Sequence, residues 1–125
     1  MNGQSIEAIS ILERALRLDD GDSASLYTLG LAYENMENYE KAINIFERLA
    51  SFRPVNKDVY YHLGLSYGRI QSLAIAHYNF GRYFKELGQI KKAKFHFQKA
   101  EGLPHSSPSL KERIRKAMEE MTPSK

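Results

Sequence analysis

The chain has 125 residues, which is the length of one domain. It contains no cysteine, which excludes disulfides, thiolate metal sites and a cysteine nucleophile, and it has no apolar run long enough to span a membrane. Its charge is uneven, because nine acidic and four basic side chains lie in residues 1–50, against six acidic and fourteen basic in residues 51–125.

We interpret the basic half as solvated helix faces. The alternative is a patch for an acidic partner, nucleic acid or anionic lipid. The lysines there do not cluster with exposed aromatic residues in a recognised nucleic-acid motif, so we predict no nucleic-acid partner. They are Lys91, Lys92, Lys94 and Lys99.

Apolar residues recur at helical spacing along the chain, and no segment alternates at period two over the length of a strand. In the first segment, Ile6, Ile9, Leu12 and Leu16 form one stripe. We therefore predict an all-α protein. The expected helices span residues 5–18, 23–36, 39–51, 57–70, 73–87, 90–101 and 108–121, and the last is a C-terminal capping helix.

Short polar side chains predict where several helices begin. Asp22 or Ser23 can cap the second helix, because a short side-chain oxygen accepts from the first-turn N–H groups. Asn56 can cap the fourth helix in the same way. Ser107, followed by Pro108 at the first helical position, predicts the start of the last helix.

The chain repeats itself at an interval of about 34 residues. Gly30 returns as Gly64, and Tyr33 returns as Tyr67. Small residues therefore match small residues, and large residues match large ones. The other matched sets are Ala8, Ala42 and Ala76, and Leu12, Phe46 and Phe80.

The two repeated glycines lie inside predicted helices, where glycine costs about 1 kcal/mol relative to alanine. A helix accepts that cost where another helix approaches closely. We therefore expect Ala42 and Ala76 to be the small residues opposite Gly30 and Gly64. The large residues, such as Phe46, would fill the space between helix hairpins.

These residues resemble the tetratricopeptide repeat family, whose pattern is a large residue, Leu-Gly, Tyr, and then Ala, Phe and Pro at fixed offsets. The resemblance covers nearly the whole chain and implies a solenoid of antiparallel helix hairpins. The chain departs from the family's pattern at Leu49, where the family prefers alanine. The residues that carry it are Leu26, Leu29, Gly30, Tyr33, Ala42, Phe46 and Pro54 in one repeat, and Tyr60, Leu63, Gly64, Tyr67, Ala76 and Phe80 in the next.

The repeat pattern has two irregularities. The chain opens in the middle of a repeat, which suggests a fragment of a longer protein. Gly81, Phe84 and Ala93 match the pattern in a frame only half a period after the previous one. The helix at 73–87 therefore matches both the second helix of one repeat and the first helix of the next. The predicted division is a half repeat at 4–20, a repeat at 23–54, a repeat at 57–88 that shares its second helix with a displaced repeat at 74–104, and a capping helix at 107–121.

The runs LGLSYGR, AHYNFGRYF and KAKFHFQKA are similar to the C-terminal repeat region of bacterial prenyl-protease-like zinc metallopeptidases. This resemblance implies a partner-recruiting part of a larger envelope protein in the periplasm. If the resemblance does not hold, the expected compartment is the cytoplasm. The family's catalytic H-E-x-x-H motif is absent. We predict no metal, no cofactor and no enzymatic activity, because the histidines lack that spacing: His62, His77, His96 and His105.

The tetratricopeptide resemblance implies a concave groove lined by the first helix of each hairpin. The family's clamp for a C-terminal carboxylate needs Lys and Asn where this chain has Tyr27 and Leu31, so we predict that the clamp is missing. The groove positions are rich in Tyr and Arg, the composition of interaction hot spots. They are Tyr27, Leu31, Glu34, Tyr61, His62, Leu65, Arg69, Tyr78, Asn79, Arg82 and Lys85.

The predicted function is a non-catalytic scaffold that binds a peptide or protein partner in this groove. The alternative is self-association through the half repeat. There Ile6, Ile9 and Leu16 keep part of their face uncovered, so two copies could pair as a homodimer.

Overall fold

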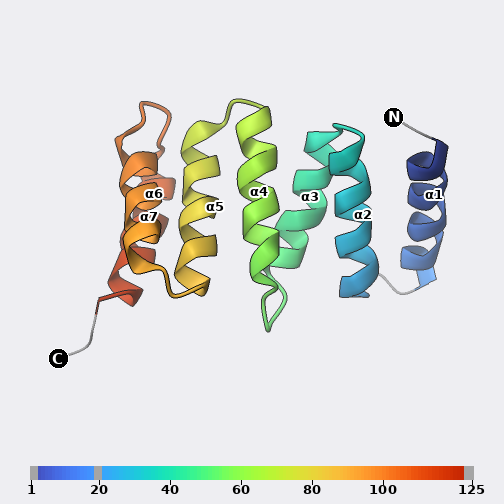
Figure 1. Cartoon of the computed structure of the whole chain (residues 1–125), viewed down its shortest axis with the longest axis horizontal. Helices are drawn as coiled ribbons and strands as arrows, with labels where there is room; N and C mark the ends of the chain where they lie inside the picture. The colour runs from blue at the N-terminus through green and yellow to red at the C-terminus, as the bar shows by residue number, and fades with distance from the viewer. Residues whose placement is uncertain (1–2, 19–20, 123–125) are drawn as a thin grey trace. The chain divides into compact units, whose positions relative to one another are not determined.

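The computed structural model describes residues 3–18 and 21–122. Within these residues the chain is helical and contains no strand, which confirms the all-α prediction (Figure 1). Residues 19–20, the end of the predicted half repeat, lie outside the described residues. The chain divides into two compact units, Met1–Val59 and Tyr60–Lys125.

Every predicted helix is present, and each boundary lies within two residues of the prediction. The agreement reflects the strength of the turn and capping signals in this sequence. The helices are α1 (Gly3–Leu18), α2 (Ser23–Asn35), α3 (Tyr39–Ala50), α4 (Lys57–Arg69), α5 (Leu73–Glu86), α6 (Ile90–Gly102) and α7 (Pro108–Glu120).

The helix caps follow the sequence prediction. Asp22, and not Ser23, caps α2. Its carboxylate accepts from the backbone N–H groups of Ala24 at 3.1 Å and Ser25 at 3.3 Å. Asn56 accepts a first-turn N–H group of α4 at 3.0 Å, and Ser107 accepts one of α7 at 3.0 Å. These bonds satisfy N–H groups that have no partner within the helix.

One helix–helix contact recurs at three places. A Cβ atom at Gly30 would lie 2.7 Å from the ring of Phe46, so only glycine fits there. We expected the repeated alanines opposite the repeated glycines; the atoms nearest to the glycine Cβ position belong to a phenylalanine ring, which fills the space that the missing side chain leaves. In the same way, a Cβ atom at Gly64 would lie 2.7 Å from the Phe80 ring, and a Cβ atom at Gly81 would lie 2.6 Å from the Phe97 ring.

The turn after each of these glycines is also the same. Seven residues beyond the glycine, the backbone takes a left-handed conformation, with φ of 61° at Glu37, 67° at Gln71 and 75° at Gly88. Helix α5 takes part in two of the three contacts. It supplies Phe80 to α4 and offers Gly81 to the Phe97 ring of α6.

The core of the second unit lies where α5, α6 and α7 meet. Alanines on α5 and α6 allow α7 to approach, and Ile114 and Leu110 of α7 fill the space. An ion pair between Lys85 of α5 and Glu120 also joins α5 to α7. The buried cluster consists of Ala74, Ala93, Phe97, Ala100, Leu110, Ile114 and Ala117.

Candidate partner-binding surfaces

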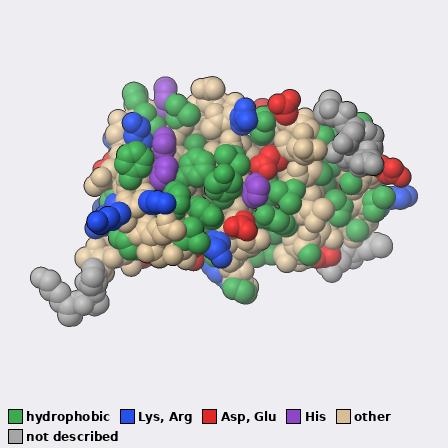
Figure 2. Space-filling view, viewed as in Figure 1, with side chains coloured by type: hydrophobic (Ala, Val, Ile, Leu, Met, Phe, Trp, Pro, Cys, Tyr) green, Lys and Arg blue, Asp and Glu red, His purple; other side chains and the backbone are tan. Residues whose placement is uncertain are grey.

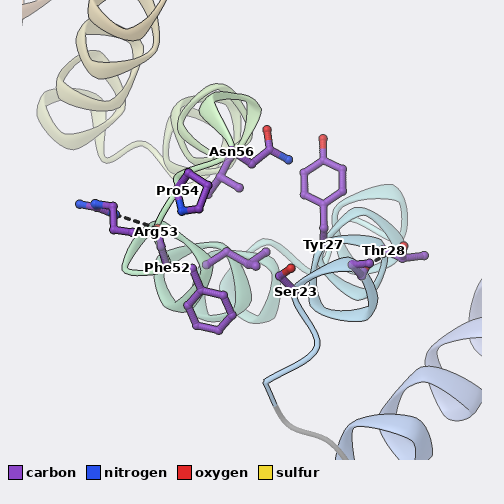
Figure 3. Close-up of a pocket in the computed structure, with 10 residues that line it drawn as sticks. Ser23, Tyr27, Thr28, Phe52, Arg53, Pro54 and Asn56 are labelled. Atoms are coloured by element: carbon purple, nitrogen blue, oxygen red, sulfur yellow. Dashed lines mark hydrogen bonds between the residues drawn. The ribbon is translucent and has the colours of Figure 1, made fainter.

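The first unit contains a pocket of about 540 Å³, between the start of α2, the end of α3 and the segment before α4. Tyr27 lies on one side of it, Pro54 and Asn56 lie opposite, and Arg53 points away (Figure 3). The volume is within the range of about 300–1,000 Å³ typical of ligand sites. The remaining lining residues are Ser23, Ala24, Thr28, Leu49, Phe52 and Val59.

Tyr27 is the predicted groove residue that this pocket contains. Its ring meets Phe46 edge-on at 6.1 Å, which fixes the ring at the wall. Burial, followed by the charges of Asp58 and Glu34, raises the pKa of the Tyr27 hydroxyl. Most of the pocket lining is apolar or aromatic, and its charged residue is Arg53, so the pocket suits an apolar group. The other predicted residues of α2, Leu31 and Glu34, are half-buried.

In the second unit, α4 presents Tyr61, Leu65 and Arg69 at the surface. These residues are spaced four apart and so lie on successive turns of one helix face. Tyr61 is 40% exposed, Leu65 is 38% exposed, and Arg69 is also exposed. We call these three residues the α4 stripe. His62, the remaining predicted residue of α4, is half-buried, and its ring lies 5.8 Å from that of Tyr61.

The predicted residues of α5 are less accessible. The Arg82 guanidinium lies 4.0 Å from the ring centroid of Tyr60 and 5.2 Å from that of Tyr78. Lys85 is paired with α7, as described above. Asn79 is only 1% exposed, and its amide donates to the Ile75 carbonyl at 3.0 Å, so this side chain is part of the interior.

The α5 rings that contact Tyr61 are not among the predicted groove residues. The Tyr61 ring contacts Phe80 at 5.8 Å and Tyr83 at 5.3 Å. Tyr78 and Arg82 are each two residues from Phe80, which is about 200° around the helix, on its opposite side. Arg82 nevertheless lies against α4, at the Tyr60 ring, one residue before Tyr61 of the α4 stripe.

A group of rings between α5 and α6 was not predicted as a surface. His96 stacks on Phe84 at 5.4 Å and on His77 at 5.3 Å, and the Nδ1 atoms of the two histidines are 3.0 Å apart. Burial lowers the pKa of both imidazoles, with further lowering from Lys99 at His77 and from His77 at His96. The interval of 19 residues between the histidines gives no motif, so only the pairing of α5 with α6 could reveal this contact.

Two features are absent from the described parts of the chain, a metal-binding cluster and a membrane-spanning helix. No group of three or more His, Asp or Glu residues there could hold a metal ion. None of the described helices is both long and apolar enough to cross a membrane.

The glycine–phenylalanine contacts and the uniform turns define a helical-repeat protein built from hairpins. Models of the tetratricopeptide repeat match residues 1–63 and residues 74–104. The chain therefore belongs to the tetratricopeptide repeat family. Repeats of this family generally mediate protein–protein interaction. No curated protein matches the chain.

Proposed function

We propose that this chain is a non-catalytic interaction module that binds a peptide segment of a protein partner on the α4 stripe. The observation that carries the proposal is the exposure of Tyr61 and Leu65 on successive turns, with Arg69 on the next. Tyrosine and arginine are among the residues enriched in binding hot spots. The chain's family membership supports a protein as the partner.

The α4 stripe is firm enough to act as a binding surface. The Tyr61 ring is held by three neighbouring rings, those of His62, Phe80 and Tyr83. A tyrosine that is already fixed loses little conformational entropy when a partner covers it. The adjacent Leu65 offers apolar area, and Arg69 offers a charge at the end of the stripe.

A random dodecapeptide library panned against the immobilised chain tests this proposal. Synthetic copies of the enriched peptides should bind in fluorescence anisotropy, and Leu65→Glu with Arg69→Glu should raise Kd at least tenfold. Both side chains are exposed, so circular dichroism should stay unchanged. Lys116→Glu on α7 is the matched control and should leave Kd unaltered. Equal binding by the double variant, or no enriched peptide, would reject the α4 stripe.

The pocket beside Tyr27 is a second place where such a partner could insert a side chain. We propose that it takes an apolar side chain, because most of its lining is apolar or aromatic. Ala24 is exposed at its rim, so Ala24→Phe should fill the opening without disturbing the core. The variant should weaken enriched peptides that carry such a side chain, and unchanged affinity for all of them would exclude the pocket.

We also propose that α5 belongs to two repeats, 57–88 and 74–104, with the half repeat at 4–20, the repeat at 23–54 and the capping helix at 107–121 completing the chain. The contacts of Phe80 with Gly64 and of Gly81 with Phe97 support this division. A parent protein of the envelope metallopeptidase type is a finer proposal, supported by the sequence runs in residues 60–100. Sequencing upstream of Met1 tests it, since an H-E-x-x-H motif is expected there and its absence would count against that parent.

Self-association is the second candidate function, and the exposed apolar residues of α1 favour it. Ile6 is 58% exposed and Ile11 is 52% exposed, while Ile9 and Leu16 are half-buried. In sedimentation equilibrium, a homodimer would appear as a molecular mass that rises with concentration and is restored to the monomer value by Ile6→Ser with Ile11→Ser. A monomer mass at all concentrations would exclude this function.

A further inference from the structure

The outer face of α6 carries an exposed phenylalanine. The helix buries Ala93, Phe97 and Ala100, and Phe95 lies about 200° around the helix from Phe97. Phe95 is 59% exposed. Since the core of the unit does not use this ring, its exposure is a feature of the surface.

Lysines surround this ring. Lys91, Lys92 and Lys99 lie four residues before, three before and four after Phe95, which places them on the same side of the helix. All three are exposed, and the one carboxylate within α6 is Glu101, near its end. We call these four residues the α6 patch. From the sequence, these lysines were only an alternative patch for an acidic partner, with no exposed aromatic residue expected among them. The structure corrects this, because Phe97 fills the core and Phe95 is therefore exposed between the lysines.

The α6 patch rests on the rings beneath it. Phe95 meets the edge of His96 at 5.2 Å, and His96 stacks on Phe84 at 5.4 Å. The Lys92 ammonium lies 5.4 Å from the centroid of the Phe84 ring. Figure 2 shows Lys or Arg and His side chains gathered beside hydrophobic ones over the region of α6. The patch is therefore a supported aromatic platform with cations around it.

We propose that the α6 patch binds an extended acidic segment of a partner protein, in which one large apolar side chain lies between two groups of carboxylates. The apolar side chain covers Phe95, and the carboxylates meet the lysines at the two ends of the patch. Lys91 and Lys99 are eight residues apart, or about 12 Å along a helix. An extended peptide covers that distance in about four residues, at roughly 3.3 Å each. Carboxylates two residues before and two after the apolar side chain therefore fit.

Two features favour a protein segment over a nucleic acid. Sites for single-stranded nucleic acid stack successive bases on several exposed rings, whereas the α6 patch has one. The repeats of this family also mediate protein–protein interaction. The α6 patch shares no residue with the α4 stripe, so the proposal does not depend on the function proposed for that stripe.

A fluorescein-labelled peptide of sequence EESFSEE is the probe, measured by fluorescence anisotropy at 50 mM salt. We expect saturable binding to the whole chain and a Kd that rises at least tenfold with Phe95→Ser. A similar rise is expected with Lys91→Gln, Lys92→Gln and Lys99→Gln combined, and with the peptide EESSSEE. Because these side chains are exposed, circular dichroism should confirm an unchanged fold in both variants.

Two matched controls separate this surface from the others. Lys111→Gln with Lys116→Gln removes charge from α7 and should leave Kd unchanged, as should Leu65→Glu with Arg69→Glu in the α4 stripe. The proposal is overturned if EESFSEE does not bind, or if EESSSEE binds equally well, since the contact would then be charge alone. Tighter binding of an oligouridylate or of phosphatidylserine vesicles would overturn it in favour of a different class of ligand.

Discussion

At the scale of single residues, three glycines set the distance between neighbouring helices. The rings of Phe46, Phe80 and Phe97 each lie where the glycine's Cβ would be. A helix containing glycine loses about 1 kcal/mol relative to alanine. Burying a phenylalanine ring contributes roughly 1.5–3 kcal/mol. This gain exceeds the cost of the glycine, so the contact stabilises the hairpin.

Gly81→Ala should therefore destabilise the chain by about 1–2 kcal/mol, because the new Cβ would overlap the Phe97 ring and overpacking outweighs the gain in helix propensity. Gly68→Ala is the matched control in the same unit. Its Cβ would lie 4.0 Å from Ala76, an ordinary contact, so this variant should be stabilised by about 0.5–1 kcal/mol. Urea denaturation measures both values, and equal effects would show that the phenylalanine contact does not constrain Gly81.

At the scale of elements, the histidine pair links α5 to α6. With the two Nδ1 atoms 3.0 Å apart, one imidazole must donate and the other must accept. Double protonation would leave two donors facing each other, and Lys99 and Lys92 add positive charge nearby. The neutral pair is therefore the form that the hairpin stabilises.

This pair gives a pH dependence with a definite sign. Because burial lowers the pKa of His77 and His96 below 6.5, the unfolded chain binds more protons than the folded chain once the pH falls below about that value. The free energy of unfolding that these histidines contribute should be fully present above about pH 6.5 and should decline as the pH falls below that value. The lowered pKa values of Glu112 and Glu120 act at lower pH, since their ordinary value is 4.5.

Urea denaturation at several pH values checks this expectation. His77→Gln with His96→Gln should flatten the decline, whereas His105→Gln, in the loop before α7, should preserve it. A decline of the same size in the double variant would mean that other groups cause it.

The elements themselves could be predicted from the sequence, and their contacts only in part. Capping residues such as Asp22 and Ser107 marked the helix starts, and the 34-residue repeat indicated hairpins. The phenylalanine rings against the glycines were not predicted, since sequence matching pairs small residues with small ones, whereas these contacts pair a small residue with a large one. The interior position of Asn79 and the exposure of Phe95 depend on how α5 and α6 rotate, which the spacing alone does not fix.

At the scale of the whole molecule, the chain offers separate surfaces of different chemistry. The first unit has a mostly apolar pocket beside Tyr27, whereas the second has the α4 stripe and the lysine-rich α6 patch. The excess of basic residues in the second half of the sequence includes the lysines of the α6 patch. Two weak contacts on one partner would strengthen each other if a single chain could reach both.

The most direct measurement of the proposed function is a nitrogen-15 NMR titration of the labelled chain with a peptide enriched against it. We predict that the largest amide shift changes fall in residues 61–69 of α4, and that they disappear in the variant with Leu65→Glu and Arg69→Glu. Changes centred on α7, or changes that persist in that variant, would contradict the assignment of the α4 stripe as the peptide-binding surface.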